Sequence, residues 1–231
     1  SFRAKWIAGS RLLNTRLYFN RAPLTHILNA PTNNGTPGAP NSTLIANSGP
    51  TMDHLRHSPT IPDENETVTI SLYATDPQGI SSITLHYSIA GAAWQQSSMT
   101  QNATGHYTAT IPGQPASSII NFYAQATDTA GATSYFPATG PDSRALYMVN
   151  DGESDPLLHN FRIIMTEADS DYMHAGINAM SNEHYPCTII SRDQDVYYNA
   201  GVHLKGSLGG RESDSKSGYR IKFNKGDLFN G

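Results

Sequence analysis

Apolar and polar residues alternate strictly in several stretches between residues 68 and 128, and this alternation limits that part of the chain to β-structure. Residues 68–74 read Val-Thr-Ile-Ser-Leu-Tyr-Ala. Three later stretches repeat the pattern, at residues 83–89, 107–111 and 120–126. A period of two places every second side chain on the same face of a strand, whereas a helix requires a period of 3.6. Residues 48–150 are therefore predicted to form a β-sandwich.

The composition agrees with a β-rich protein that has many loops. Of the 231 residues, 38% are hydrophobic, which is enough for folded cores, and only 15% are charged. The formal net charge of −4 gives no reason to expect nucleic acid as a partner. No apolar run is long enough for a transmembrane helix. We expect a mainly β, multidomain protein that works outside the cell or at the cell surface.

Two aspartates, two histidines and the single cysteine invite sharper interpretations. Asp76 and Asp128 each begin a turn that contains glycine, so each carboxylate is expected to accept hydrogen bonds within its own turn rather than to bind calcium. His54 and His57 would share one face of a helix and could then bind a metal, but the flanking prolines favour an extended strand. Cys187 has no partner for an internal disulfide and is predicted to be a buried strand thiol.

Two resemblances describe the first part of the chain. Residues 36–42 read Thr-Pro-Gly-Ala-Pro-Asn-Ser, which resembles the tail that closes lamin-tail-like domains of secreted bacterial proteins. This resemblance implies that residues 1–42 are the C-terminal end of such a β domain. The strand expected at residues 121–128 resembles strands of immunoglobulin-like and fibronectin type III-like modules, which implies a module of this kind for residues 48–150.

A third region begins at residues 151–156, an acidic linker that contains Pro and Gly. Strands are expected at residues 161–165, 187–190 and 196–204. Because a helix is expected between the first two strands, residues 151–231 are predicted to start an α+β domain.

The expected helix is capped by Asp169 or Ser170. Its apolar face is predicted to carry Met173, Ile177 and Met180. Acidic side chains near a helix start are favoured by its unpaired N–H groups. We therefore interpret three residues as helix-start residues rather than cation ligands: Glu167, Asp169 and Asp171.

Residues 197–224 are predicted to form two strands joined by a loop of Gly, Ser and charged residues. Val202 and Leu204 precede the loop, Tyr219 and Ile221 follow it, and Lys or Arg fills several alternate positions. Glycine lets backbone N–H groups approach a phosphate, and Arg and Lys supply the opposite charge. The spacing matches neither a Walker A loop nor G-x-G-x-x-G. An anion site and an ordinary exposed hairpin with a basic face both remain open on this pattern.

Two motifs of this unit resemble the opening of the spore-coat kinase (CotH) family. The first is Gly201-Val202-x-Leu204-Lys205-Gly206-Ser207 followed by Arg211, and the second is Lys216-x-x-Tyr219-Arg220-Ile221-Lys222-Phe223. The resemblance implies an atypical kinase-like fold that transfers phosphate from ATP, with Mg²⁺ or Mn²⁺, to Ser or Thr hydroxyls of a protein.

The resemblance also assigns roles to residues by position. Lys216 would hold nucleotide phosphates, and Gly206, Ser207 and Arg211 would shape the loop over them. In this family the catalytic Asp and the metal-binding Asp lie well downstream of the two motifs. No catalytic or metal-binding residue is therefore expected in these 231 residues, and the chain alone is expected to be inactive as a kinase.

Two other classes of function fit the sequence. The first is an adhesion protein whose β-modules bind carbohydrate or protein and whose kinase-like domain is degenerate; the second is a structural spacer. A row of exposed aromatic side chains on the sandwich would favour the adhesion protein. The candidates are Tyr73, Trp94 and Tyr123, for which packing at the edge of the module is the alternative.

Overall fold

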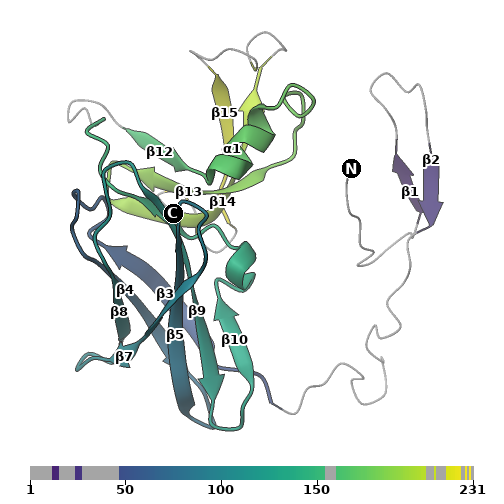
Figure 1. The fold of residues 1–231 in the computed structure, drawn as a ribbon. Helices are drawn as coiled ribbons and strands as arrows, with labels where there is room; N and C mark the ends of the chain where they lie inside the picture. Colours follow the sequence, from purple (N-terminus) through teal and green to yellow (C-terminus); the bar gives the residue numbers. More distant parts are fainter. Residues whose placement is uncertain are drawn as a thin grey trace. The chain divides into compact units, whose positions relative to one another are not determined.

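The computed structural model describes residues 12–15, 24–27, 47–153, 160–206, 211, 217–224, 227 and 229. The protein is mainly β, as the alternation predicts (Figure 1). Its contacts divide the chain into two compact units, residues 1–46 and residues 47–231. None of the described helices is long and apolar enough to cross a membrane.

In the first unit, the described residues form an antiparallel hairpin of β1 (Leu12–Thr15) and β2 (Leu24–Ile27). The ending at residues 36–42, on which the resemblance to a lamin-tail-like domain depends, lies outside the described residues.

Two antiparallel sheets form the sandwich predicted for residues 48–150. The first sheet has the order β3-β4-β8-β7, with the bounds Thr51–Ser58, Val68–Thr75, Tyr107–Ile111 and Thr100–Gln101. The second has the order β10-β9-β5-β6, with the bounds Thr133–Phe136, Ile119–Asp128, Ile80–Ile89 and Gln95–Ser98. A further strand, β11 (Leu146–Met148), pairs with the start of β9. The 3₁₀ helix η2 (Gly140–Asp142) lies between β10 and β11 in the chain.

The core of the sandwich consists of the inward-facing residues that the alternation predicts. Ile70 and Leu72 from the first sheet and Leu85 and Phe122 from the second are fully buried and belong to one cluster. Burying a side chain of this size stabilises the fold by roughly 1.5–3 kcal/mol. The hydrophobic effect therefore holds the two sheets face to face.

Two polar residues of β5 depart from the expected alternation. His86 and Ser88 face away from the core, yet both are buried. The ring of Tyr123 covers that of His86, and the hydroxyl of Ser88 donates a hydrogen bond of 2.6 Å to the carbonyl oxygen of Ala92. The outer face of this sheet is thus partly covered by its own side chains.

The two aspartate turns are confirmed. Asp76 accepts a hydrogen bond from the backbone N–H of Gln78, and Asp128 accepts bonds of 2.8 Å from the backbone N–H groups of Ala130 and Ala132. Burial disfavours the charged form of Asp128, but the hydrogen bonds from Asn47 and from the turn outweigh burial and hold its pKa below the ordinary value. Both carboxylates therefore accept backbone hydrogen bonds within their own turns, as predicted.

A third antiparallel sheet follows the sandwich. Its order is β12-β13-β14-β15, with the bounds Phe161–Ile164, Tyr185–Ser191, Asp195–Lys205 and Gly218–Lys222. The helix α1 (Glu167–His174) covers one face of this sheet (Figure 1), where Met173 packs in one cluster with Val202 and Leu204. The strands and one helix expected after residue 160 are therefore present.

The prediction for this helix was wrong in its start and its length. Thr166 is the N-cap, because its side chain accepts a hydrogen bond of 3.2 Å from the backbone N–H of Asp169. The helix ends at His174, so Met173 is buried as predicted, whereas Ile177 is 93% exposed and Met180 is also exposed. The periodic pattern of apolar residues continues past Ala175, where the backbone leaves the helical conformation.

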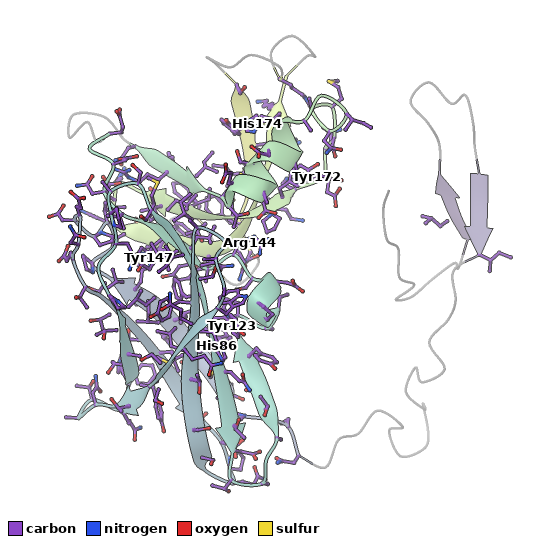
Figure 2. All side chains as sticks on the ribbon, in the orientation of Figure 1. His86, Tyr123, Arg144, Tyr147, Tyr172 and His174 are labelled. Carbon is purple, nitrogen blue, oxygen red and sulfur yellow. The ribbon has the colours of Figure 1, made fainter. Side chains whose placement is uncertain are left out.

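The chain segment at the start of β11 forms hydrogen bonds with both α1 and the third sheet. The guanidinium group of Arg144 donates hydrogen bonds to the carboxylate of Asp169 on α1. The hydroxyl of Thr188 on β13 donates to the carbonyl oxygen of Arg144 at 2.6 Å and accepts from the N–H of Leu146 at 2.9 Å. Leu146, Ile164 and Ile190 pack together beside these bonds. Figure 2 labels Arg144 beneath α1.

A tyrosine of the third sheet completes the sandwich core. The ring of Tyr198 on β14 lies edge-to-face with Phe122, at 5.6 Å between centroids. Its hydroxyl accepts a hydrogen bond of 3.2 Å from the backbone N–H of His57 and donates one to Nδ1 of the same residue. Nε2 of His57 donates to the carbonyl oxygen of Thr60 at 2.9 Å, and the imidazole stacks on Tyr147 at 5.2 Å. A carbonyl oxygen only accepts, so Nε2 carries a proton, and burial favours the neutral ring, in which Nδ1 accepts from Tyr198.

We predict that acid destabilises the protein through His57. Burial lowers its pKa to about 4, and the hydrogen bond to Thr60 opposes this shift. The unfolded chain binds the proton first as the pH falls, so the free energy of unfolding decreases by about 3 kcal/mol between pH 6.5 and pH 4. Urea unfolding of the wild type and of His57→Asn at a series of pH values measures this contribution. An equal pH dependence in both proteins would contradict the assignment.

Candidate functional site

The strand-loop-strand unit predicted near residue 200 is a hairpin of β14 and β15. The register pairs Gly201 with Lys222 and His203 with Arg220. Of the residues predicted to contact or cover phosphate, Gly206 and Arg211 are described, and Gly206 has a φ of +122°, which favours glycine. Ser207 and Lys216 lie outside the described residues. The roles assigned to these four residues remain predictions.

The side chain of Arg211 forms hydrogen bonds with two different segments of the chain. Its guanidinium group donates to the carbonyl oxygen of Gly206 at 2.9 Å and to that of Ser181 at 2.9 Å. It also donates to the carbonyl oxygen of Ala179 and to the side chain of Asn182. These bonds join the end of β14 to the segment that follows α1. Arg211 therefore links Gly206 to residues 179–182 by its own hydrogen bonds.

Cationic and imidazole side chains gather on the hairpin face opposite α1. His203 and Lys205 alternate on β14 with Val202 and Leu204, which pack on the helix side. Arg220 and Lys222 alternate with Ile221 in the same way. His184, which directly precedes β13, places its ring 4.6 Å from that of His203. We call His184, His203, Arg220 and Lys222 the basic face.

The basic face depends on a glycine in β14. A Cβ atom at Gly201 would lie 2.9 Å from Cβ of His184, closer than side chains tolerate. The missing side chain therefore lets His184 lie over the strand beside His203. Burial is the first cause of the lowered pKa of His184, and the charges of His203, Lys222 and Arg220 add to it. Burial and the neighbouring basic side chains therefore both disfavour the protonated form of His184.

The structure also tests the predictions for Cys187 and for the acidic residues of α1. Cys187 is fully buried in β13, and burial together with the Asp169 charge raises the pKa of its thiol to about 12, which excludes a thiolate at neutral pH. Glu167 and Asp169 lie in the first turn of α1 as predicted, and Asp169 also binds Arg144. Asp171 lies beyond the first turn, so its prediction as a helix-start residue was wrong.

A cleft of about 770 Å³ lies between the sandwich and the third sheet. One side is β3, in which a β-bulge separates Asp53 from Arg56, and His54 in the bulge has a φ of 52°. The other side is the start of β14. Burial raises the pKa of Asp227, which lines the cleft, and the charge of Arg56 opposes this shift. Gly206 and Arg211 do not line the cleft.

The aromatic candidates on the sandwich lie on different sheets. Tyr73 and Trp94 are each 37% exposed, but Tyr123 is buried. Tyr73 belongs to β4 and packs against His54 and His106. Trp94 directly precedes β6 and contacts Tyr123 on β9. Both β6 and β9 belong to the second sheet of the sandwich, whereas β4 belongs to the first. The three residues therefore do not form one row.

Some site residues carry no signal in the sequence. The face shared by His184 and His203 depends on the register between β13 and β14, which shifts between Cys187 and Ile189. The pair of His57 and Tyr198 joins residues 141 positions apart. An alternating stretch that contains both Tyr197 and Tyr198 does not reveal which ring enters the sandwich.

Comparison with protein-family models gave no match, and neither did comparison with curated proteins. Among solved structures, 30% of the chain is similar to 71% of the Br derivative of BhCBM56, at 13% identity and a TM-score of 0.26. Similarity also extends over 66% of the chain to an uncharacterized Listeria monocytogenes EGD-e protein in complex with glucose, magnesium and calcium. The same coverage holds for the cycloalternan-forming enzyme of Listeria monocytogenes in complex with a pentasaccharide substrate.

Both Listeria comparisons give 10% identity and a TM-score of 0.32. The match spans 12% of the length of each Listeria chain. At these TM-scores the likeness supports no conclusion about function.

We predict that Lys222→Gln raises the pKa of His184 toward its ordinary value, because the substitution removes a neighbouring positive charge. NMR titration of the imidazole signals measures this change. Arg56→Gln on β3 removes the same charge from the cleft and is the matched control. An unchanged His184 pKa in Lys222→Gln would show that the basic face is not assembled as described.

Proposed function

We propose that the hairpin of β14 and β15 binds the phosphate groups of ATP and that residues 151–231 are the N-terminal part of a CotH-type atypical protein kinase. In the complete enzyme, phosphate would pass from ATP to Ser or Thr hydroxyls of a protein substrate. The observation that carries this proposal is the basic face, which supports the phosphate binding implied by the two sequence motifs.

The charges of the basic face suit a phosphate group. Arg220 and Lys222 are exposed, and they lie beside the rings of His184 and His203, of which His203 is buried. The positive side chains that would hold a phosphate here, Arg220 and Lys222, both come from β15. Such contacts stabilise the negative charge that spreads over the transferred group during phosphoryl transfer.

The proposal includes Mg²⁺ or Mn²⁺ with the nucleotide. When bound, the metal ion would neutralise phosphate charge. Among the described residues, no group of three His, Cys, Asp or Glu side chains is arranged to hold a metal ion. The proposal therefore assigns phosphate contacts to this part of the chain and assigns no metal ligand within it.

The β-sandwich supports a second candidate function, which is binding of carbohydrate or protein at the cell surface or outside the cell. The specific observation in its favour is a cluster of aromatic rings on the outer face of one sheet, two of which are exposed. In this candidate the kinase-like part is degenerate. Nucleotide binding distinguishes the two functions.

We predict that the 231-residue chain binds ATP in the presence of Mg²⁺ or Mn²⁺. Each of Arg220→Gln and Lys222→Gln should weaken binding by roughly tenfold or more, because each removes a charge-assisted contact to phosphate. The resemblance predicts a similar loss for Lys216→Ala. Isothermal titration calorimetry measures these affinities.

Arg56→Gln is the matched control, because it changes the net charge equally at the separate cleft. It should leave ATP affinity unchanged. Absence of ATP binding by the wild type, or an equal loss in the control, would refute phosphate binding at the hairpin.

A further inference from the structure

Four rings gather on the outer face of the sheet β10-β9-β5-β6. Tyr123 lies at their centre, and its ring stacks on that of His86, with 4.6 Å between centroids and 1° between planes. Trp94 and Tyr135 approach Tyr123 edge-to-face, at centroid distances of 4.9 and 6.0 Å. Figure 2 labels His86 and Tyr123 next to each other on this sheet. We call these four residues the aromatic face.

The aromatic face has a buried base and two exposed rings. His86 and Tyr123 are 8% and 7% exposed, whereas Trp94 and Tyr135 are 37% and 42% exposed. The ring of Tyr135 lies against η2, where a Cβ atom on Gly140 would be 3.3 Å from its Cγ. The exposed rings are therefore held by packing, and large aromatic side chains exposed together on a surface favour a binding role.

The outward-facing polar side chains of the strands in this sheet are uncharged. The outward-facing residues of the four strands include Thr84, His86, Gln96, Tyr123, Gln125, Thr127, Thr133 and Tyr135, with no Asp, Glu, Lys or Arg. Oε1 of Gln125 lies 3.1 Å from Nε2 of His86, and Gln96 is the direct cross-strand neighbour of His86. Burial lowers the pKa of His86, against the effect of its bond to Gln125, so the imidazole is neutral at pH 7.

This combination selects one class of ligand. A sugar ring presents weakly positive C–H groups to the negative face of an aromatic ring, and its hydroxyls pair with amide groups at the edge. A charged ligand would find no opposite charge among the strand residues of this face. We propose that the aromatic face binds a neutral carbohydrate, whose sugar rings stack on Trp94 and Tyr135 and whose hydroxyls bond to Gln96 and Gln125.

This inference rests on the binding role given above as the second candidate function, and it is independent of phosphate binding. The two sites lie on different sheets and have different ligands. If the chain does not bind ATP, the carbohydrate proposal still stands. If the chain does not bind carbohydrate, the phosphate proposal still stands.

Affinity electrophoresis of the 231-residue chain tests the inference. The gels contain a soluble β-1,3-glucan, β-1,4-glucan, α-glucan or mannan as neutral polysaccharides, or polygalacturonate as an anionic one. The wild type should be retarded by at least one neutral polymer and not by polygalacturonate. Trp94→Ala and Tyr135→Ala should each weaken binding about tenfold or more, because each removes a stacking surface.

Tyr73→Ala is the matched control, since Tyr73 is as exposed as Trp94 but lies on the other sheet. It should bind as the wild type does. A thermal melt of each variant confirms that it is folded. The inference is overturned if no neutral polymer retards the wild type, if Tyr73→Ala loses as much affinity as Trp94→Ala, or if the folded Trp94→Ala and Tyr135→Ala variants bind normally.

Discussion

The hydrogen-bonded pair of Tyr198 and His57 joins the third sheet to the sandwich. Tyr198 places its ring against Phe122, and its hydroxyl both accepts from the backbone of His57 and donates to its imidazole. A buried imidazole left without a partner would cost about 1–3 kcal/mol, so this contact favours one orientation of β14 relative to the sandwich. The ion pair of Arg144 with Asp169 and the bonds of Thr188 reinforce the same junction.

The orientation of β14 in turn positions the basic face. Tyr198 lies near one end of this strand, and His203 and Lys205 lie at the other end, where β15 continues the hairpin. Apolar side chains on one face of the hairpin pack beneath α1, which leaves the cationic side chains for the opposite face. The same strand therefore anchors the third sheet at one end and carries the proposed phosphate site at the other.

The sequence predicts the strands of the sandwich well because their signal is local. Alternation at Leu72, Leu85 and Phe122 depends only on near neighbours and on which face is buried. The extent of α1 was not predictable in this way, because the helix begins at the N-cap Thr166 and ends before Ala175, where the backbone leaves the helical conformation (ψ 132°). The apolar positions Ile177 and Met180 continue the helical spacing beyond that end.

The sequence predicts only part of the candidate site, because some of its side chains meet only through pairing between strands. The basic hairpin is visible in the sequence, but the approach of His184 to His203 requires the β13–β14 register and the missing side chain of Gly201. The aromatic face likewise requires the cross-strand neighbours of Tyr123, among them His86, which are distant in sequence. Side chains that meet only through sheet pairing leave no local pattern.

The central claim is that the basic face receives a phosphate group. NMR titration of the chain with a non-hydrolysable ATP analogue and Mg²⁺ tests it most directly, through the imidazole signals of His184 and His203. The account predicts saturable shifts of both signals and a rise in the pKa of His184, because a bound anion favours the protonated ring. Saturable shifts confined to other residues, or no shifts at all, would contradict it.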